Sequence, residues 1–170
     1  MPIKYIGAVL VFVACSAVGF SMAANYKKEE RYLFELIRTL ENMGCELEYR
    51  LTPLPQMCRN AAVDAYGSIG KVLLALADEL DSQVSPDAAC CMQIALSAVS
   101  DLPSRIESKL LGLGYSLGRY DLNGQLKEID SVMRSCTADL EEMRSNRDKR
   151  VRSYQTLGLC AGAGLAIMLL

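Results

Sequence analysis

Apolar residues recur every three or four positions through most of the middle of the chain. In residues 27–51 this spacing gives one apolar face at 3.6 residues per turn, made of Leu33, Leu36, Ile37, Leu40, Met43, Leu47 and Leu51. No segment shows the alternation of apolar and polar positions that a half-buried strand requires. The pattern therefore predicts an all-α protein with a bundle of about six helices, the later ones running from 53–55 to about 66, over 72–80, from 86 to 99, from 103 to 117 and from about 122 onward.

Prolines and capping residues mark the expected helix boundaries. Thr52-Pro53-Leu54-Pro55 ends the first helix, because a proline disfavours helical conformation in the residue before it. Ser85-Pro86-Asp87 is typical of a helix start, with a capping hydroxyl and a proline at the first helical position. Asp121 is expected to cap the longest helix, whose apolar positions form a coiled-coil-like seam: Leu126, Ile129, Met133, Cys136, Leu140 and Met143.

Three glycines interrupt the apolar spacing near the end of the helix over 103–117. Gly112, Gly114 and Gly118 each weaken a helix, because glycine loses more conformational freedom on folding than other residues. A glycine inside a helical pattern usually has a packing reason. The pattern predicts either close packing or a bend at this point.

Both ends of the chain are uncharged. Residues 6–24 form a 19-residue apolar run and residues 154–170 a 17-residue run, against the ~20 residues that a helix needs to cross a bilayer. The sequence therefore predicts an N-terminal transmembrane helix at 1–26, a cytoplasmic bundle at 27–153 and a C-terminal transmembrane helix at 154–170. We expect the last bundle helix to continue into the second span, because no proline intervenes.

Two questions about the ends stay open. Ser21-Met22-Ala23 or Met22-Ala23-Ala24 resembles a signal-peptide cleavage site, so the first run could be removed. The second run is short, and the sequence does not decide whether it spans fully. Within it, Gly158 and Gly162 form a G-x-x-x-G pattern, which lets helix backbones approach closely in lipid.

Basic residues crowd the inner edges of both apolar runs, and the positive-inside rule then places the intervening domain in the cytoplasm. On the outer side of the two runs, the only basic residue is Lys4. Residues 27–152 carry 17 basic and 20 acidic residues, a net charge of −3 that argues against nucleic-acid binding. The flanking basic residues are Lys27, Lys28, Arg31 and Arg38 after the first run, and Arg144, Arg147, Lys149, Arg150 and Arg152 before the second.

The chain offers little for catalysis. It has no histidine, so no Ser-His or Cys-His pair can activate a nucleophile. Its seven cysteines contain no C-x-x-C pair, which argues against zinc and predicts reduced, packed thiols in the cytoplasm. Carboxylates such as Glu46 are expected on solvated helix faces. We predict a non-enzymatic protein without cofactor or metal; the alternative is an enzyme that uses a reactive cysteine among Cys45, Cys58, Cys90, Cys91 and Cys136.

An ordered set of residues resembles the stage III sporulation protein AB family of spore-forming Firmicutes. The likeness begins with Leu36-Ile37-Arg38-Thr39-Leu40-Glu41, Glu48-Tyr49 and the Thr52 to Pro55 segment. It continues with Gly114-x-x-Leu117-Gly118-x-x-Asp121-x-x-x-Gln125-x-Lys127 and closes with Leu157-Gly158-x-x-Ala161-Gly162. Two departures affect packing or capping: Tyr120 stands where the family usually has serine, and the family's tryptophan near Ser85 is absent.

The resemblance implies a domain similar to the cytoplasmic F domain of type II secretion and type IV pilus platform proteins. It implies a scaffold in the mother-cell membrane around the forespore, in a secretion-like channel complex needed for endospore formation. The expected partners are a cytosolic secretion-type ATPase and other membrane subunits. The alternative is a membrane-tethered coiled-coil spacer or a self-assembling structural protein, and a homo-oligomer is a further expectation. Candidate docking or junction residues are Thr52, Pro53, Leu54, Pro55, Leu117, Gly118, Asp121 and Gln125.

Overall fold

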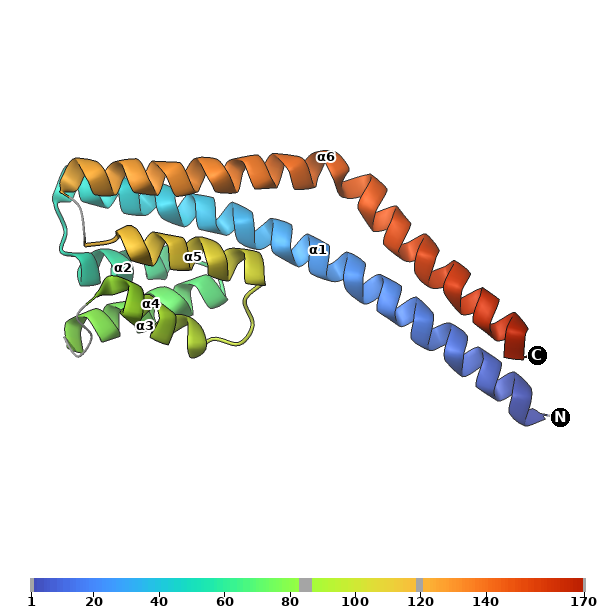
Figure 1. Cartoon of the computed structure of the whole chain (residues 1–170). Helices are drawn as coiled ribbons and strands as arrows, with labels where there is room; N and C mark the ends of the chain where they lie inside the picture. The colour runs from blue at the N-terminus through green and yellow to red at the C-terminus, as the bar shows by residue number, and fades with distance from the viewer. Residues whose placement is uncertain (1, 83–86, 119–120, 170) are drawn as a thin grey trace. The chain divides into compact units, whose positions relative to one another are not determined.

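The chain forms six helices in the parts that the computed structural model describes, which are residues 2–82, 87–118 and 121–169 (Figure 1). No strand occurs within these ranges. The prediction of an all-α protein with about six helices is therefore confirmed. In chain order the helices are α1 (Pro2–Arg50), α2 (Leu54–Asp64), α3 (Ser68–Ser82), α4 (Ala88–Ser97), α5 (Ser104–Ser116) and α6 (Leu122–Leu169).

The chain divides into two compact units, to which the long helices α1 and α6 both contribute. Residues 31–140 form one unit, which we call the bundle unit. Residues 1–30 and 141–170 form the other, which we call the paired-helix unit. The three-part division predicted from the sequence remains a prediction.

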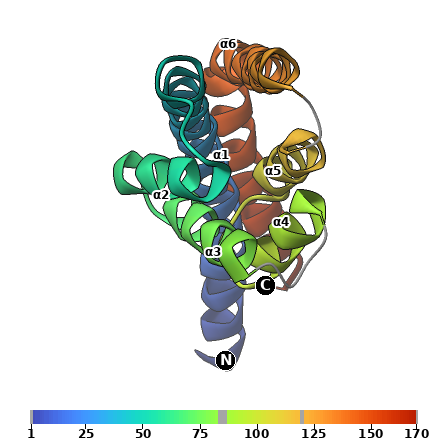
Figure 2. The same cartoon turned by 90° about the vertical axis from the view of Figure 1, so that its left-hand side faces the viewer.

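The bundle unit is built from α2 to α5 and the adjoining parts of α1 and α6. Helix α3 contacts both α2 and α4, and α4 contacts α5, so these four helices follow one another in chain order (Figure 2). The Tyr32 hydroxyl donates to Ser68 Oγ at 3.1 Å and joins α1 to the start of α3. The largest fully buried side chains in the unit are Leu33, Leu36, Leu40, Met43, Met57, Ile69, Leu73, Leu76, Met92, Ile106, Leu110 and Leu113.

Most apolar positions predicted from periodicity are buried, but Ile37, Leu126 and Met133 inside their helices are only half-buried. Leu36 and Leu40 on α1 are buried, as are Ile106 and Leu110 on α5. The predicted inward position of Leu51 is wrong, because this side chain is 68% exposed. Leu51 follows the last residue of α1 and has a φ of +50°, so the helical phase no longer applies to it. Leu80, in the last turn of α3, and Val99, beyond the end of α4, are only half-buried.

The backbone of Leu51 is strained, because a side chain in the left-handed region crowds the following carbonyl. Leu51→Gly is expected to raise the free energy of unfolding by about 1 kcal/mol, since glycine adopts this conformation without that cost. The measurement is urea unfolding followed by circular dichroism. The same substitution at Leu74, an exposed position inside α3, is the control and should lower stability by about 1 kcal/mol. A lower free energy of unfolding for Leu51→Gly would show that the backbone at Leu51 is not strained.

The structure confirms most of the predicted boundary chemistry. The Gly124 amide donates to Asp121 Oδ1 at 3.0 Å, so Asp121 caps α6 as predicted. Helix α6 is continuous from Leu122 to Leu169, also as predicted. Helix α4 starts at Ala88 after Asp87, whose side chain makes no capping hydrogen bond, while Ser85 and Pro86 lie outside the described residues.

The paired-helix unit holds α1 and α6 antiparallel. The Tyr26 hydroxyl donates to the Met143 carbonyl oxygen at 2.9 Å. Glu30 forms ion pairs with Arg144 and Arg147, at 3.6 and 3.5 Å. Within the described residues, no helix contains a stretch both long enough and apolar enough to cross a membrane. The transmembrane helices expected at 1–26 and 154–170 are not confirmed.

Candidate docking surface at the helix junctions

Two of the predicted junction segments meet in the bundle unit. A Cβ atom on Gly118 would stand 4.0 Å from Leu54 Cδ2, so the turn after α5 lies against the start of α2. Gly118 has a φ of +78°, which a side chain would rarely adopt. Leu117 just before it is buried, and its amide donates to the Leu113 carbonyl at 3.0 Å. The structure therefore brings together segments that lie far apart in the sequence.

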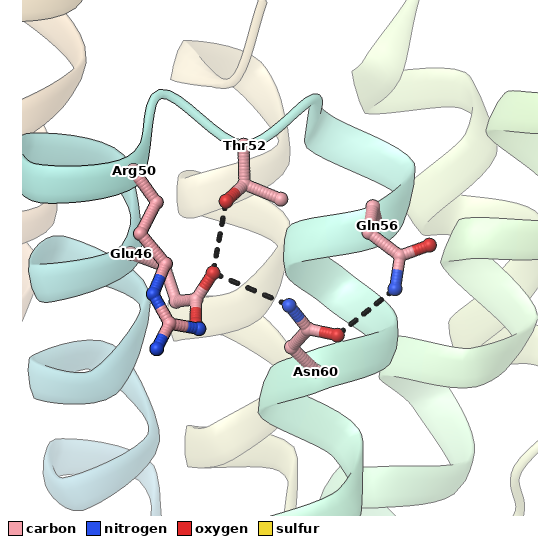
Figure 3. A network of polar contacts seen from close by, with 5 residues as sticks. All are labelled: Glu46, Arg50, Thr52, Gln56 and Asn60. Atoms are coloured by element: carbon pink, nitrogen blue, oxygen red, sulfur yellow. Dashed lines mark hydrogen bonds and ion pairs between the residues drawn. The ribbon is translucent and has the colours of Figure 1, made fainter.

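Thr52 belongs to a polar network centred on Glu46 (Figure 3). The Thr52 hydroxyl donates to Glu46 Oε2 at 2.9 Å, and Asn60 Nδ2 donates to the same oxygen at 3.2 Å. Arg50 Nη1 lies 2.8 Å from Glu46 Oε1, and Gln56 Nε2 donates to Asn60 Oδ1 at 2.9 Å. The network ties the end of α1 to the turn and to the first half of α2.

The expectation that Glu46 lies on a solvated face is wrong. Its side chain is only 18% exposed, whereas that of its partner Arg50 is 72% exposed. Both carboxylate oxygens accept hydrogen bonds, which offsets the loss of water around the charge. The four-residue spacing of Glu46 and Arg50 signals their pairing in the sequence. The hydrogen bonds from Thr52 and Asn60 depend on how the chain turns, and no local pattern indicates them.

The hydrogen bond from Thr52, together with those from Asn60 and Arg50, holds the pKa of Glu46 below its ordinary value. A carboxyl whose pKa is lower in the folded than in the unfolded state stabilises the fold above its unfolded pKa. That stabilisation is lost as the pH falls through the folded pKa. Glu46 therefore supports the junction at neutral pH and ceases to do so in acid.

Glu46→Gln is expected to lower the melting temperature at pH 7, because the uncharged amide cannot replace the carboxylate as acceptor of three donors. The difference from the unchanged protein should begin to shrink below about pH 4, where the carboxyl of the unfolded chain becomes protonated, and should go on shrinking as the pH falls through the lower pKa of the folded state. Thermal unfolding followed by circular dichroism at several pH values provides the measurement. Glu48→Gln, at an exposed neighbouring position, is the control and should show little change at any pH. A constant difference between pH 7 and pH 3 would disprove the charge-dependent role.

A groove lies beside this network, between α1 and α2. We call it the α1–α2 groove, and its volume is about 520 Å³. Two apolar side chains at its rim are strongly exposed, Tyr49 at 79% and Val63 at 83%. Exposed aromatic and apolar residues beside polar groups are typical of protein-contact surfaces. The groove, which the sequence did not indicate, is lined by Asn42, Cys45, Glu46, Tyr49, Arg50, Asn60, Ala61, Val63 and Asp64.

The remaining predicted site residues lie at the starts of α2 and α6 and near the end of α6. Pro53 is the N-cap residue of α2, and Pro55 stands in its first turn, where the missing amide costs no hydrogen bond. The Gln125 amide donates to the Asp121 carbonyl at 2.9 Å, so these two share the first turn of α6. Gly158 and Gly162 fall within α6, but their packing lies outside the described residues.

The cysteines are free thiols with different environments. Burial raises the pKa of Cys58 to about 12 and that of Cys136 to about 11, so both stay protonated. Cys91 is also buried, but Cys45 and Cys90 are exposed, so the prediction of packed thiols is wrong for these two. Among the residues that the structure describes, no group of three or more potential ligands could hold a metal ion.

These features define a class of protein: an all-helical protein whose most distinctive polar groups join helices to one another. Residues 4–170 match the family model of stage III sporulation protein AB, and the chain belongs to this family. Stage III sporulation protein AB of Bacillus subtilis (strain 168) is 29% identical over 174 residues, which cover 99% of each chain.

A solved structure of stage III sporulation protein AB (SpoIIIAB) has the same fold. It matches with a TM-score of 0.63 over 72% of this chain and 98% of that chain, at 22% identity. The resemblance inferred from the residues is thus confirmed. Membership of the family supports a role in sporulation, and the family is one of structural sporulation proteins, not a known family of enzymes.

Proposed function

We propose that this chain is a non-enzymatic scaffold subunit of the mother cell–forespore secretion-like channel. Its ends at 1–26 and 154–170 hold it in the mother-cell membrane around the forespore. Its bundle unit faces the cytoplasm, where it docks a cytosolic secretion-type ATPase and contacts other membrane subunits. The observation that carries this proposal is the opposite charge of the two units.

The bundle unit contains 15 acidic and 10 basic residues, a net charge of −5, whereas the paired-helix unit contains 5 acidic and 8 basic residues, a net charge of +3. Seven of those eight basic residues lie at 27–28 and 144–152, beside the apolar ends. Basic residues in this position are retained on the cytoplasmic side and attracted to anionic headgroups. The acidic bundle unit is repelled by the same surface and left available to a partner.

The described part of the paired-helix unit exposes large apolar side chains. They occur on both helices, and all seven are more than half exposed. A surface in contact with water rarely carries so many large apolar side chains, and such a surface marks contact with lipid or protein. This supports lipid contact by the chain ends. The side chains are Leu10, Val13, Val18, Phe20, Met22, Leu157 and Ile167.

The α1–α2 groove is the surface of the bundle unit that best suits a protein partner. Asp64 supplies an exposed carboxylate to the lining, and Glu48, which precedes the lining residue Tyr49 on α1, is a second exposed carboxylate. Tyr49 offers a large amphipathic contact, of the kind enriched where interfaces hold most of their binding energy. We therefore assign the ATPase contact to this groove, with a basic and apolar surface of the partner facing it.

Co-purification with the secretion-type ATPase of the proposed channel complex tests the docking. Asp64→Lys and Glu48→Lys are expected to reduce recovery of the ATPase severalfold, because a reversed charge meets a partner of the same sign. Asp87→Lys is the control, since this exposed side chain lies on α4 and makes no capping hydrogen bond. Equal recovery with all four proteins would remove the docking proposal.

Labelling of the exposed thiols Cys45 and Cys90 tests the location of the bundle unit in the protein without any substitution. A membrane-impermeant maleimide added to intact protoplasts should leave both unlabelled, because the bundle unit faces the cytoplasm. Lysis should make both reactive. Peptide mapping of the labelled protein distinguishes these sites from the other cysteines. Labelling of Cys45 and Cys90 in intact protoplasts would overturn the proposed topology.

The structure gives no support to the coiled-coil spacer. Its predicted seam would pair between chains, yet Ile129, Cys136 and Leu140 are buried within a single chain. Leu126 and Met133 are also half-buried. The seam stabilises the protein's own bundle, so pairing through it would require the bundle to open.

A further inference from the structure

The paired-helix unit contains an apolar groove between α1 and α6, with a volume of about 460 Å³. Two apolar side chains on its rim, Val18 and Leu157, are more than half exposed. Apart from one phenol and one thiol, its lining side chains have no polar atoms. We call it the α1–α6 groove; it is lined by Ala14, Cys15, Val18, Gly19, Met22, Tyr154, Leu157 and Ala161.

The groove ends next to an arginine on the same face of α6. Ala161, Leu157, Tyr154 and Arg150 follow one another at steps of four, three and four residues, which places them in one row along the helix. Arg150 and Tyr154 both lie near enough to the Tyr26 phenol to interact with it electrostatically. The row therefore changes from apolar to cationic within one turn, at Tyr154.

Among the residues that the structure describes, none balances the charge of Arg150 by an ion pair. The next basic residue in the row, Arg147, pairs with Glu30. Arg150 is exposed and forms no ion pair or hydrogen bond with any residue that the structure describes. An arginine in this situation presents up to five donors to an anion and binds phosphate with two parallel hydrogen bonds.

We propose that the α1–α6 groove binds an acyl chain of an anionic phospholipid and that Arg150 binds the phosphate of its headgroup. An acyl chain in the groove covers the apolar side chains of its lining and so removes them from water, which is favourable. Tyr154 lies between the two regions, where its ring contacts the chain and its hydroxyl reaches the headgroup. A zwitterionic lipid gains the same apolar contacts but carries no net negative charge for Arg150 to bind.

This inference rests on the proposed membrane attachment and adds a specific lipid to it. The headgroup end of the groove lies beside the basic residues at 147–152, on the side of the unit that the proposed topology places at the cytoplasmic leaflet. The site therefore takes lipid from the cytoplasmic leaflet.

Native mass spectrometry of the full chain, released from detergent micelles, tests the site. Phosphatidylglycerol and phosphatidylcholine with identical acyl chains are added at equal concentration. We expect the phosphatidylglycerol adduct to exceed the phosphatidylcholine adduct about fivefold, as one arginine contact near a headgroup allows. Arg150→Gln should make the two adducts nearly equal. Ala14→Phe, which fills the groove from an exposed position, should reduce both adducts alike.

Lys149→Gln is the matched control, because it removes the same charge from the neighbouring residue on a different face of α6. It should leave the lipid preference unchanged. An equal loss of preference in Lys149→Gln and Arg150→Gln, or no preference in the unchanged protein, would overturn the site. A dimer without lipid would show that a second copy fills the groove and would also overturn it. The lipid preference is measured in detergent, so its failure leaves the protoplast labelling result, and the proposed function, untouched.

Discussion

Leu73→Ala is expected to lower the free energy of unfolding by about 2–5 kcal/mol, the range found for a large apolar side chain removed from a packed core. Leu73 is fully buried in α3, the helix that contacts both α2 and α4. Removal of its isobutyl group leaves a cavity that neighbours on two sides cannot easily fill. Urea unfolding of the full chain, followed by circular dichroism, gives the value.

The adjacent leucine provides the control. Leu74 is 47% exposed, so Leu74→Ala should change the free energy of unfolding by no more than about 0.5 kcal/mol. Both variants lose the same atoms from the same helix, and both gain the same helix propensity. The difference between them therefore measures burial alone. Similar losses from the two substitutions would mean that α3 presents a different face to the core.

This pair also shows what the sequence predicts well. The spacing of Val72, Leu73 and Leu76 sets the phase of α3, and each of these side chains is buried. The same reasoning works for α1 and α5, because burial of one helix face is a local consequence of 3.6 residues per turn. The boundaries set by Asp121 and by Pro53 with Pro55 are local too, and they are where the sequence placed them.

The candidate site was predicted less completely, because its geometry depends on residues distant in the chain. Thr52 and Leu54 are predicted junction residues, and the structure places them at the junction. Their main partners, Glu46, Asn60 and Gly118, are set by how α1, α2 and α5 pack. Only Gly118 was among the predicted residues. The α1–α2 groove forms between faces of two helices, and no periodicity in either helix alone describes a space between them.

The glycines of α5 show the same limit at a single position. Gly112 and Gly114 stand two residues apart in the same helix, and the helical pattern gives no reason to treat them differently, although only Gly114 belongs to the residues that carry the family resemblance. In the structure nothing lies within 4 Å of a Cβ placed on Gly112. A Cβ on Gly114 would lie 2.6 Å from Met92 Cβ and 3.0 Å from Met92 Cγ. Gly114 thus permits the close approach of α4 and α5, and Gly112 has no such role.

The two alanine substitutions are therefore expected to act in opposite directions. Gly114→Ala should lower the free energy of unfolding by about 1–3 kcal/mol, because the added methyl group forces α4 away from α5. Met92 cannot avoid the clash by changing rotamer, since its own Cβ is the nearest atom. Gly112→Ala should raise the free energy of unfolding by about 0.5–1 kcal/mol through helix propensity alone. Urea unfolding of the full chain measures both. Stabilisation by Gly114→Ala would show that α4 and α5 do not approach each other this closely.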